Sequence, residues 1–217
     1  MSILVFGFEP FLEFDENPAQ LLVQRLDART FKGERVTGVV LPVDYEKAGR
    51  GITRAIDSVK PELAIGFGLG PGRERIMPEK IAVNYRFAER ADGAGRRMAG
   101  SPIDASGPDG LFTNLPVEGL VASLNEHGFP ASLSLSAGSY VCNNAMFVIV
   151  REARSRGFAG GFVHVPCHSK WIAKRKKQMP SLPLETLQRG AEHCIACCLR
   201  HQTSAGSVKL RPPRGSQ

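Results

Sequence analysis

One cysteine occupies a position from which a thiol could act as a nucleophile. Cys142 lies in a turn of small residues, 136–144, directly before an apolar run that predicts a helix. At the amino end of a helix, the dipole and the unpaired backbone N–H groups stabilise a thiolate, and the same groups can hold an oxyanion during acyl transfer. A single cysteine is more often part of a hydrophobic core, so the turn by itself leaves both interpretations open.

A histidine and a glutamate far apart in the sequence could complete such a site. His164 stands near the end of the β-rich segment 160–166, where it is either a half-buried, hydrogen-bonded histidine or the general base that activates the thiol. Glu79 precedes a predicted strand. An isolated glutamate is usually a solvated surface group, but beside His164 it would orient the imidazole.

Short β-rich runs alternate with longer amphipathic segments along the chain. We expect strands at 3–6, 36–41, 63–67, 81–85, 131–135 and 161–165, and helices at 18–26, 45–59, 117–127, 143–155 and 184–201. This alternation predicts an α/β fold with a mainly parallel sheet covered by helices on both faces. Functional groups of such sheets collect at the carboxyl ends of the strands, which is where 7–11, 66–73, 137–144 and His164 fall.

Capping residues and connections complete this prediction. Asn17 is a suitable N-cap for the helix 18–26, with Pro18 at its first position. Gly157 would end the helix 143–155 at its carboxyl end. Residues 91–110 carry no periodic pattern and predict a long loop, which in a compact domain is usually functional or disordered. Residues 170–183 predict a basic connection that contains proline.

The glycine-rich segment 66–73 does not match a nucleotide-binding loop. The last glycine of a Gly-x-Gly-x-x-Gly pattern would fall on Pro71 or on Arg73, depending on the register. No Gly-Lys-Ser/Thr sequence follows either. The segment therefore predicts a tight turn that lets another part of the chain approach the backbone closely.

Length and charge limit the function classes. A chain of 217 residues predicts one globular domain, 1–203, followed by a flexible basic tail, 204–217. The net charge of +7 is concentrated in 170–177 and in the tail, which differs from the aromatic-rich basic face of a nucleic-acid binder. The apolar run 146–150 is far shorter than the roughly 18 residues of a membrane span, and the amino terminus does not resemble a signal peptide.

The five cysteines predict reduced thiols in a cytoplasmic protein, because no secretory signal precedes them. Cys194, Cys197 and Cys198 have the spacing of a metal or redox motif, but a closed zinc site needs four ligands and no second pair stands at zinc spacing. Their small apolar neighbours favour packing on a buried helix face. We therefore expect neither a metal nor a cofactor.

Eight segments, in order, resemble the pyroglutamyl peptidase I family of cysteine peptidases, also called pyrrolidone carboxyl peptidases. Each segment is weakly specific, whereas the ordered set and the agreement in chain length are strongly specific. The matching segments are 7–11, 17–18, 41–43, 72–73, 79–84, 107–110, 136–143 and 161–166.

The resemblance implies a catalytic triad of Glu79, Cys142 and His164 that removes an N-terminal pyroglutamyl (5-oxoproline) residue from peptides through a thioester. It implies a three-layer α/β/α sandwich, a cytoplasmic homo-oligomer, commonly a tetramer, and no metal. Phe8 and Phe11 are expected to form the walls of the substrate pocket. The further residues expected to bind substrate are Asn17 and Val141.

Three departures from the family pattern keep alternatives open. Leu12-Glu13 stands where the family usually has a glycine pair. Glu89 stands where an arginine is expected, and Arg90 is displaced by one position. Residues 167–170, Cys-His-Ser-Lys, stand where the family usually has an aromatic residue and Pro-Glu-Gln. One alternative is specificity for a different blocked N-terminus. Another is a non-catalytic binding module, for which the 170–177 patch would bind acidic partners rather than form a solvated loop.

Overall fold

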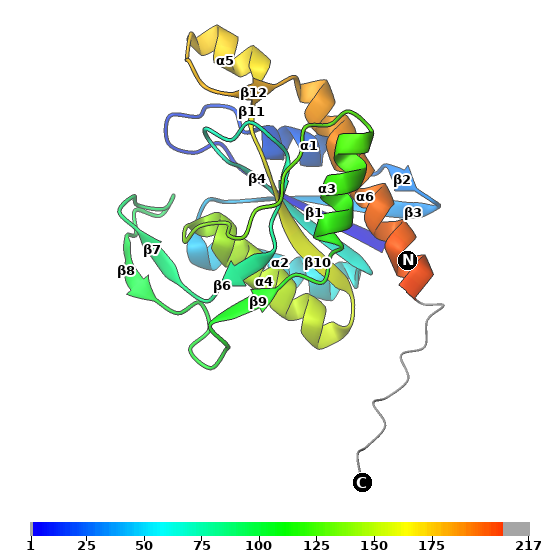
Figure 1. Ribbon diagram of the computed structural model, residues 1–217. Coiled ribbons are helices and arrows are strands. Elements are labelled where there is room, and N and C mark those ends of the chain that lie inside the picture. The colour runs from blue at the N-terminus through cyan, green and yellow to red at the C-terminus, as the bar shows by residue number, and fades with distance from the viewer. Residues whose placement is uncertain (1, 206–217) are drawn as a thin grey trace.

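A six-stranded sheet forms the centre of the computed structural model, which describes residues 2–205 (Figure 1). Its strands follow the order β2-β3-β1-β4-β10-β5. The four central strands are parallel, and the two short strands at the edges pair antiparallel. The bounds in this order are Thr30–Phe31, Glu34–Leu41, Ser2–Phe8, Leu63–Leu69, Ala159–Val165 and Met77–Pro78.

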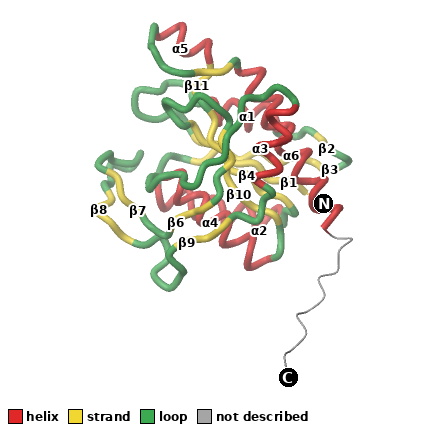
Figure 2. The backbone as a smooth tube through the Cα atoms, viewed as in Figure 1, coloured by secondary structure: helices red, strands yellow, loops and turns green. Residues whose placement is uncertain are grey.

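Helices cover both faces of this sheet, which makes the three layers visible in Figures 1 and 2. One hydrophobic cluster joins one face of the sheet to three helices, α1 (Pro18–Leu26), α3 (Val117–Glu126) and α6 (Leu184–Ala205). A second cluster joins the other face to α2 (Tyr45–Val59) and α4 (Val141–Arg156). The predicted α/β/α sandwich with a mainly parallel sheet is confirmed.

Local capping explains where several helices begin and end. The Asn17 side chain accepts a hydrogen bond from the Ala19 N–H, and Asp44 caps α2 in the same way. Gly157 ends α4 in the left-handed conformation, with φ of 78°. Both α1 and α2 have the predicted bounds, whereas α4 begins two residues earlier than expected.

Three segments differ from their predictions. The expected strand 131–135 forms only isolated bridges to 76–79, and Leu133 and Leu135 are exposed instead of lying on a buried face. The expected loop 91–110 contains β8 (Met98–Ser101), which pairs with β7 (Arg86–Ala88). The expected connection 170–183 contains most of α5 (Ser169–Arg175). The remaining short strands are β6 (Ile81–Val83), β9 (Gly110–Phe112), β11 (Cys167–His168) and β12 (Ser181–Leu182).

The carboxyl-terminal helix buries two of its three cysteines. Cys194 and Cys198 belong to the first hydrophobic cluster, as the packing interpretation predicted. Helix α6 extends through Ala205, so the predicted tail begins inside it, and residues 206–217 of that tail lie outside the described residues. Among residues 2–205, no helix combines the length and the apolar character that crossing a membrane requires.

Candidate active site

Strand β10 places His164 beside Glu79. His164 lies near the carboxyl end of this central strand, and its imidazole Nδ1 is 2.7 Å from Glu79 Oε1. The main chain fixes the glutamate, because the Glu79 N–H donates to the Phe162 carbonyl on the same strand. Both side chains are buried. The hydrogen bond to the carboxylate places the proton on Nδ1 and leaves the lone pair on Nε2, the form that a general base needs.

Helix α4 brings Cys142 to the same end of the sheet. Cys142 lies in the first turn of α4, as predicted, and its Sγ is 3.0 Å from the position that a Cβ on Gly68 would occupy. Gly68 is the register partner of His164 in the β4–β10 pair. The sulfur thus lies over the backbone of β4, next to the strand that carries the imidazole. The glycine-rich segment allows this close approach, as the sequence predicted.

Arg73, which in the sequence is only part of a segment resembling the family, forms an ion pair with Glu79. Arg73 Nη2 is 3.2 Å from Glu79 Oε1, the same oxygen that accepts from His164. Glu79 Oε2 has no hydrogen-bond partner among the described residues. Arg73 follows the glycine turn after β4, and no signal in the sequence connects it to Glu79, six positions further on, because the contact depends on how the turn folds back.

Burial determines the protonation states of the thiol and the imidazole. It raises the pKa of the Cys142 thiol to about 12, with the Glu79 charge acting in the same direction and Arg73 opposing it. Burial lowers the pKa of His164, although the hydrogen bond to Glu79 and the Glu79 charge both act to raise it. At neutral pH both groups are therefore uncharged. This differs from the thiolate expected at a helix amino end, because loss of hydration outweighs the stabilisation by the N–H groups of the first turn.

A cavity of about 680 Å³ opens at the sulfur and the imidazole. Its volume lies within the range typical of small-molecule sites. The lining consists of the rim at Phe11 and Leu12, the glycine turn with Arg73, residues 87–90, the turn 136–140, Cys142 and His164. Two of the departures from the family pattern, at Leu12 and at Glu89-Arg90, therefore lie at the cavity itself.

Of the four residues expected to bind substrate, one lines the cavity and three lie outside its lining. Phe11 lines the cavity. Phe8 is buried in the second hydrophobic cluster, where its ring lies 6.3 Å from that of Phe162, and Val141 is buried in the same cluster. Asn17 caps α1 and donates from its Nδ2 to the Glu9 carbonyl. Phe8, Val141 and Asn17 thus lie outside the lining and support the segments that form it.

Asn143 holds the first turn of α4 against the segment 83–85. Its side-chain oxygen accepts from the Val83 N–H, and its Nδ2 donates to the carbonyls of Val83 and Tyr85. Asn143 is fully buried, so these hydrogen bonds are shielded from water. Asn143 belongs to the segment 136–143 that resembles the family, but its role could not be predicted from the sequence because its partners lie about 60 positions away.

The replaced segment 167–170 supports the rim of the cavity. His168 caps α5 and lies 3.2 Å from Glu16, while the Trp171 indole N–H donates to Asp15 at 2.6 Å. Arg175 also pairs with Asp15. These contacts anchor the loop that carries Phe11. They also neutralise part of the 170–177 patch within the molecule, which favours a solvated surface over a site for acidic partners, although most of this stretch is helix α5 rather than the expected loop.

A thiol, an imidazole and a carboxylate at the carboxyl end of a parallel sheet, beside a cavity, define the class of α/β cysteine hydrolases. Comparison with known proteins gives the family. A family model described as pyroglutamyl peptidase matches residues 1–201.

Relatives agree over nearly the whole chain. Pyrrolidone-carboxylate peptidase 1 of Saccharolobus solfataricus is 50% identical over 210 residues, which cover 97% of this chain and 100% of that protein. A pyrrolidone-carboxylate peptidase of Saccharolobus islandicus is 53% identical over 190 residues, covering 88% and 91%. A crystal structure of pyrrolidone carboxyl peptidase from Pyrococcus furiosus has a TM-score of 0.89 at 33% identity and covers 93% of this chain and 99% of that one. The chain belongs to the pyroglutamyl peptidase family and is a cysteine-type hydrolase.

Proposed function

We propose that this enzyme hydrolyses the peptide bond that follows an N-terminal pyroglutamyl residue, with Cys142 as nucleophile, His164 as general base and acid, and Glu79 as the group that orients the imidazole. One observation carries the assignment: the Cys142 sulfur packs on Gly68, the register partner of His164, and His164 is hydrogen-bonded to Glu79. The names of the relatives support the substrate.

The cavity suits a small neutral ring. Pyroglutamate is a lactam without a free amine, so a complementary pocket needs apolar walls and few polar contacts. Phe11, Leu69 and Ala137 supply apolar lining, and the cavity has room for a five-membered ring beside the sulfur. We assign the wall to Phe11, and we assign to Phe8, Val141 and Asn17 the support of the segments around the ring.

The proposed reaction starts from an uncharged Cys142 thiol and an uncharged His164 imidazole. His164 Nε2 takes the Sγ proton as the sulfur attacks the carbonyl carbon, so charge forms only in the transition state. The first-turn N–H groups of α4 stabilise the oxyanion. The imidazolium then protonates the leaving amine as the C–N bond breaks, which leaves a thioester. A water molecule, deprotonated by His164, attacks the thioester and releases pyroglutamate and the thiol.

The test uses a pyroglutamyl-aminocoumarin substrate, with prolyl-aminocoumarin as the comparison. We expect release of the fluorophore from the pyroglutamyl substrate alone. Cys142→Ser lowers kcat by on the order of 10³-fold or more, because a serine hydroxyl is a much weaker nucleophile in this setting. Cys167→Ser is the matched control, since Cys167 is buried outside the lining. Loss of activity in Cys167→Ser with retention in Cys142→Ser would contradict the assignment.

Specificity for another blocked N-terminus is a second candidate, favoured by the place of Glu89 and Arg90 in the cavity lining. A panel of acetyl-, formyl- and pyroglutamyl-aminocoumarins separates the two candidates. The main proposal requires the highest kcat/KM for the pyroglutamyl substrate. A higher value for an acyclic blocked substrate would establish the second candidate and retain the same triad.

We further propose that the enzyme is a cytoplasmic homo-tetramer. All five cysteines are free, and a thiol nucleophile functions best where thiols are kept reduced. Several large apolar side chains are exposed, among them Phe112 and Leu135, which is consistent with burial between subunits.

A further inference from the structure

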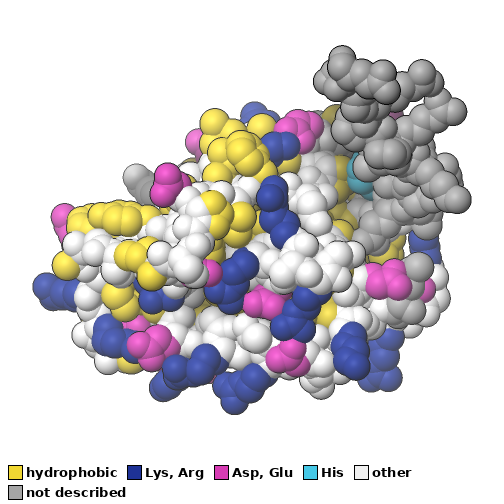
Figure 3. Space-filling view, turned by 90° about the horizontal axis from the view of Figure 1, so that it is seen from below, with side chains coloured by type: hydrophobic (Ala, Val, Ile, Leu, Met, Phe, Trp, Pro, Cys, Tyr) yellow, Lys and Arg dark blue, Asp and Glu magenta, His cyan; other side chains and the backbone are white. Residues whose placement is uncertain are grey.

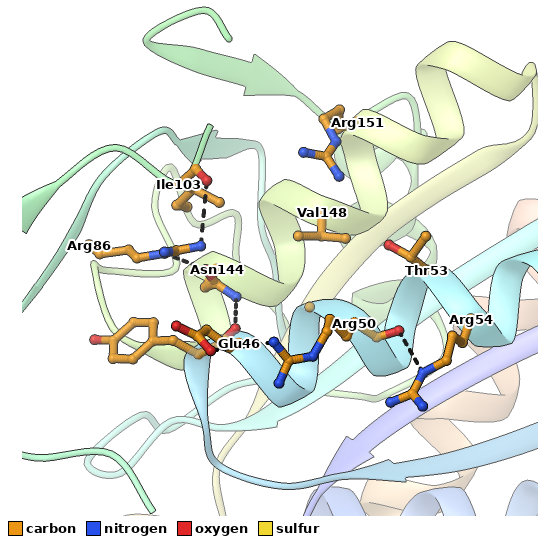
Figure 4. Close-up of a pocket in the computed structure, with 11 residues that line it drawn as sticks. Glu46, Arg50, Thr53, Arg54, Arg86, Ile103, Asn144, Val148 and Arg151 are labelled. Carbon is orange, nitrogen blue, oxygen red and sulfur yellow. Dashed lines mark hydrogen bonds and ion pairs between the residues drawn. The ribbon is translucent and has the colours of Figure 1, made fainter. Parts of the chain in front are cut away.

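A second cavity lies between α2 and α4 and shares no lining residue with the cavity at Cys142. Its volume is about 540 Å³. Helices α2 and α4 lie low in Figure 1, and the face seen from below in Figure 3 carries many Lys and Arg side chains. Figure 4 shows the residues used below: Glu46, Arg50, Thr53, Arg54, Arg86, Ile103, Asn144, Val148 and Arg151.

Four arginines and one glutamate line this cleft. The Glu46 carboxylate is shared between Arg50, at 3.4 Å, and Arg96, at 2.8 Å. Arg151 pairs with acidic residues outside the lining, Asp104 at 3.3 Å and Glu152 at 3.0 Å. The cleft therefore carries more positive than negative charge, and its acidic group is already occupied.

Two of these arginines have no carboxylate partner. Within residues 2–205, no carboxylate oxygen lies within 4.0 Å of Arg54 or Arg86, whose hydrogen bonds go to two backbone carbonyls and one side-chain amide. Arg54 donates from Nε to the Arg50 carbonyl at 3.3 Å, which leaves both terminal nitrogens of its guanidinium free to bind a ligand. Four arginines around one cavity, two of them without a carboxylate partner, favour the binding of an anion.

Arg86 is half-buried and held in a fixed orientation. Its Nε donates to Asn144 Oδ1 at 2.8 Å and its Nη2 to the Ile103 carbonyl at 3.4 Å. Burial lowers the pKa of Arg86, with Arg96 acting in the same direction and Glu46 opposing it. A partly desolvated guanidinium without an ion-pair partner is unfavourable, and a bound anion would relieve this.

We propose that this cleft binds a small phosphate-bearing molecule with several negative charges. Guanidinium forks match the oxygens of phosphate groups, and the Thr53 hydroxyl can donate to the same oxygens. Val148 and Ile103 provide apolar surface for the carbon skeleton of an organic phosphate. The arginines surround one volume rather than follow a stripe, so a compact polyanion fits them better than an extended acidic peptide.

Binding is measured by calorimetry on the full chain, with inorganic tripolyphosphate as the probe and sulfate at matched ionic strength as the comparison. We expect tripolyphosphate to bind at least tenfold more tightly than sulfate. Arg54→Gln weakens tripolyphosphate binding about tenfold, the effect of losing one charge-assisted contact. Arg35→Gln is the matched control, because Arg35 is exposed on β3 and lines neither cavity. Equal losses in the two variants would overturn the proposal.

A second measurement needs no variant. Phenylglyoxal modifies accessible arginines, and mass spectrometry locates the modified sites. We expect tripolyphosphate to protect Arg54 and Arg50 in the wild-type protein while Arg35 stays reactive. Protection by oligoglutamate but not by tripolyphosphate would contradict the proposal and indicate an acidic protein partner instead.

Discussion

Cys142 and His164, the proposed nucleophile and base, are both uncharged at rest. Burial raises the Cys142 pKa and lowers the His164 pKa, so neither a thiolate nor an imidazolium is the stable form at neutral pH. The reactive ion pair then forms as the sulfur attacks. Glu79 favours this step, because its charge and hydrogen bond raise the pKa of the imidazole that must accept the proton.

The pH dependence of activity follows from His164. Catalysis needs the neutral imidazole, and the His164 pKa lies below its ordinary value of about 6.5. We therefore expect kcat/KM to rise with pH below this value and to be constant through neutrality, as measured with the pyroglutamyl substrate. An acid limb centred above pH 7 would contradict this.

Glu79→Gln tests the same residue pair. It removes the charge that raises the His164 pKa, so the acid limb should move to lower pH while kcat falls by on the order of 10²–10⁴-fold. Glu118→Gln is the control, because Glu118 is an exposed carboxylate paired with Lys80. A limb that does not move in Glu79→Gln would show that the carboxylate does not act on His164.

Strand β4 and helix α4 are packed closely enough to position the Cys142 sulfur. A Cβ on Gly68 would lie 3.0 Å from Cys142 Sγ and 2.8 Å from the Phe162 ring. Both neighbours are fixed, one by the first turn of α4 and the other by burial in the sheet. The glycine is thus a requirement of the site as well as of the packing.

Gly68→Ala should impair both stability and catalysis. Overpacking of this kind lowers the free energy of unfolding by about 1–3 kcal/mol, and displacing the sulfur by about 1 Å lowers kcat about 10²-fold. Gly119→Ala is the control, because its Cβ in α3 would meet nothing within 4 Å. We expect that variant to gain up to about 1 kcal/mol in unfolding free energy and to keep full activity. Urea denaturation and the aminocoumarin assay measure the two effects.

The rim loop carries backbone strain at Leu12. This residue has φ of 54°, in the left-handed region that favours glycine. A left-handed conformation costs a non-glycine residue about 1–2 kcal/mol. Leu12 is 52% exposed, so little buried surface compensates for this cost.

Leu12→Gly is expected to raise the free energy of unfolding by about 0.5–1 kcal/mol, less than the full strain because glycine is also more flexible in the unfolded chain. Leu135→Gly is the matched control: Leu135 is 63% exposed and has no positive φ, so this change should be neutral or destabilising. Denaturant titration compares the two variants. Equal effects would show that the Leu12 backbone is not strained.

The two helical layers leave several apolar side chains uncovered. Tyr85 and Phe87 stack with their rings 6.4 Å apart and are both exposed, as are Phe112 and Leu135. Association of subunits would remove such surface from water. These exposed apolar side chains support the proposed tetramer.

Light scattering after size-exclusion chromatography measures the mass in solution. A tetramer of a 23.5 kDa chain has a mass of about 94 kDa. We expect this value at micromolar concentrations, unchanged by the reductant because all cysteines are free. A mass of one chain across the same concentrations would contradict the proposal.

The layers of the fold and the places of the proposed triad residues along the chain could be predicted from local sequence patterns. Asn17, Pro18 and Gly157 mark helix ends through local backbone chemistry, and that chemistry acts within a few residues. The alternation of strands and helices then requires His164 and Cys142 to lie at the carboxyl edge of the sheet. The segment 131–135 was mispredicted because its pattern shows apolar residues without showing whether a neighbouring strand covers them.

Features that depend on partners distant in the chain could not be predicted from the sequence. The ion pair of Arg73 with Glu79, the high pKa of Cys142 and the support of the rim loop by Trp171 all arise from packing between segments that the local pattern does not relate. The arginine-lined cleft has the same origin, because α2, β7 and α4 each contribute to it. Desolvation and charge pairing depend on position in space, and the folded chain alone fixes that.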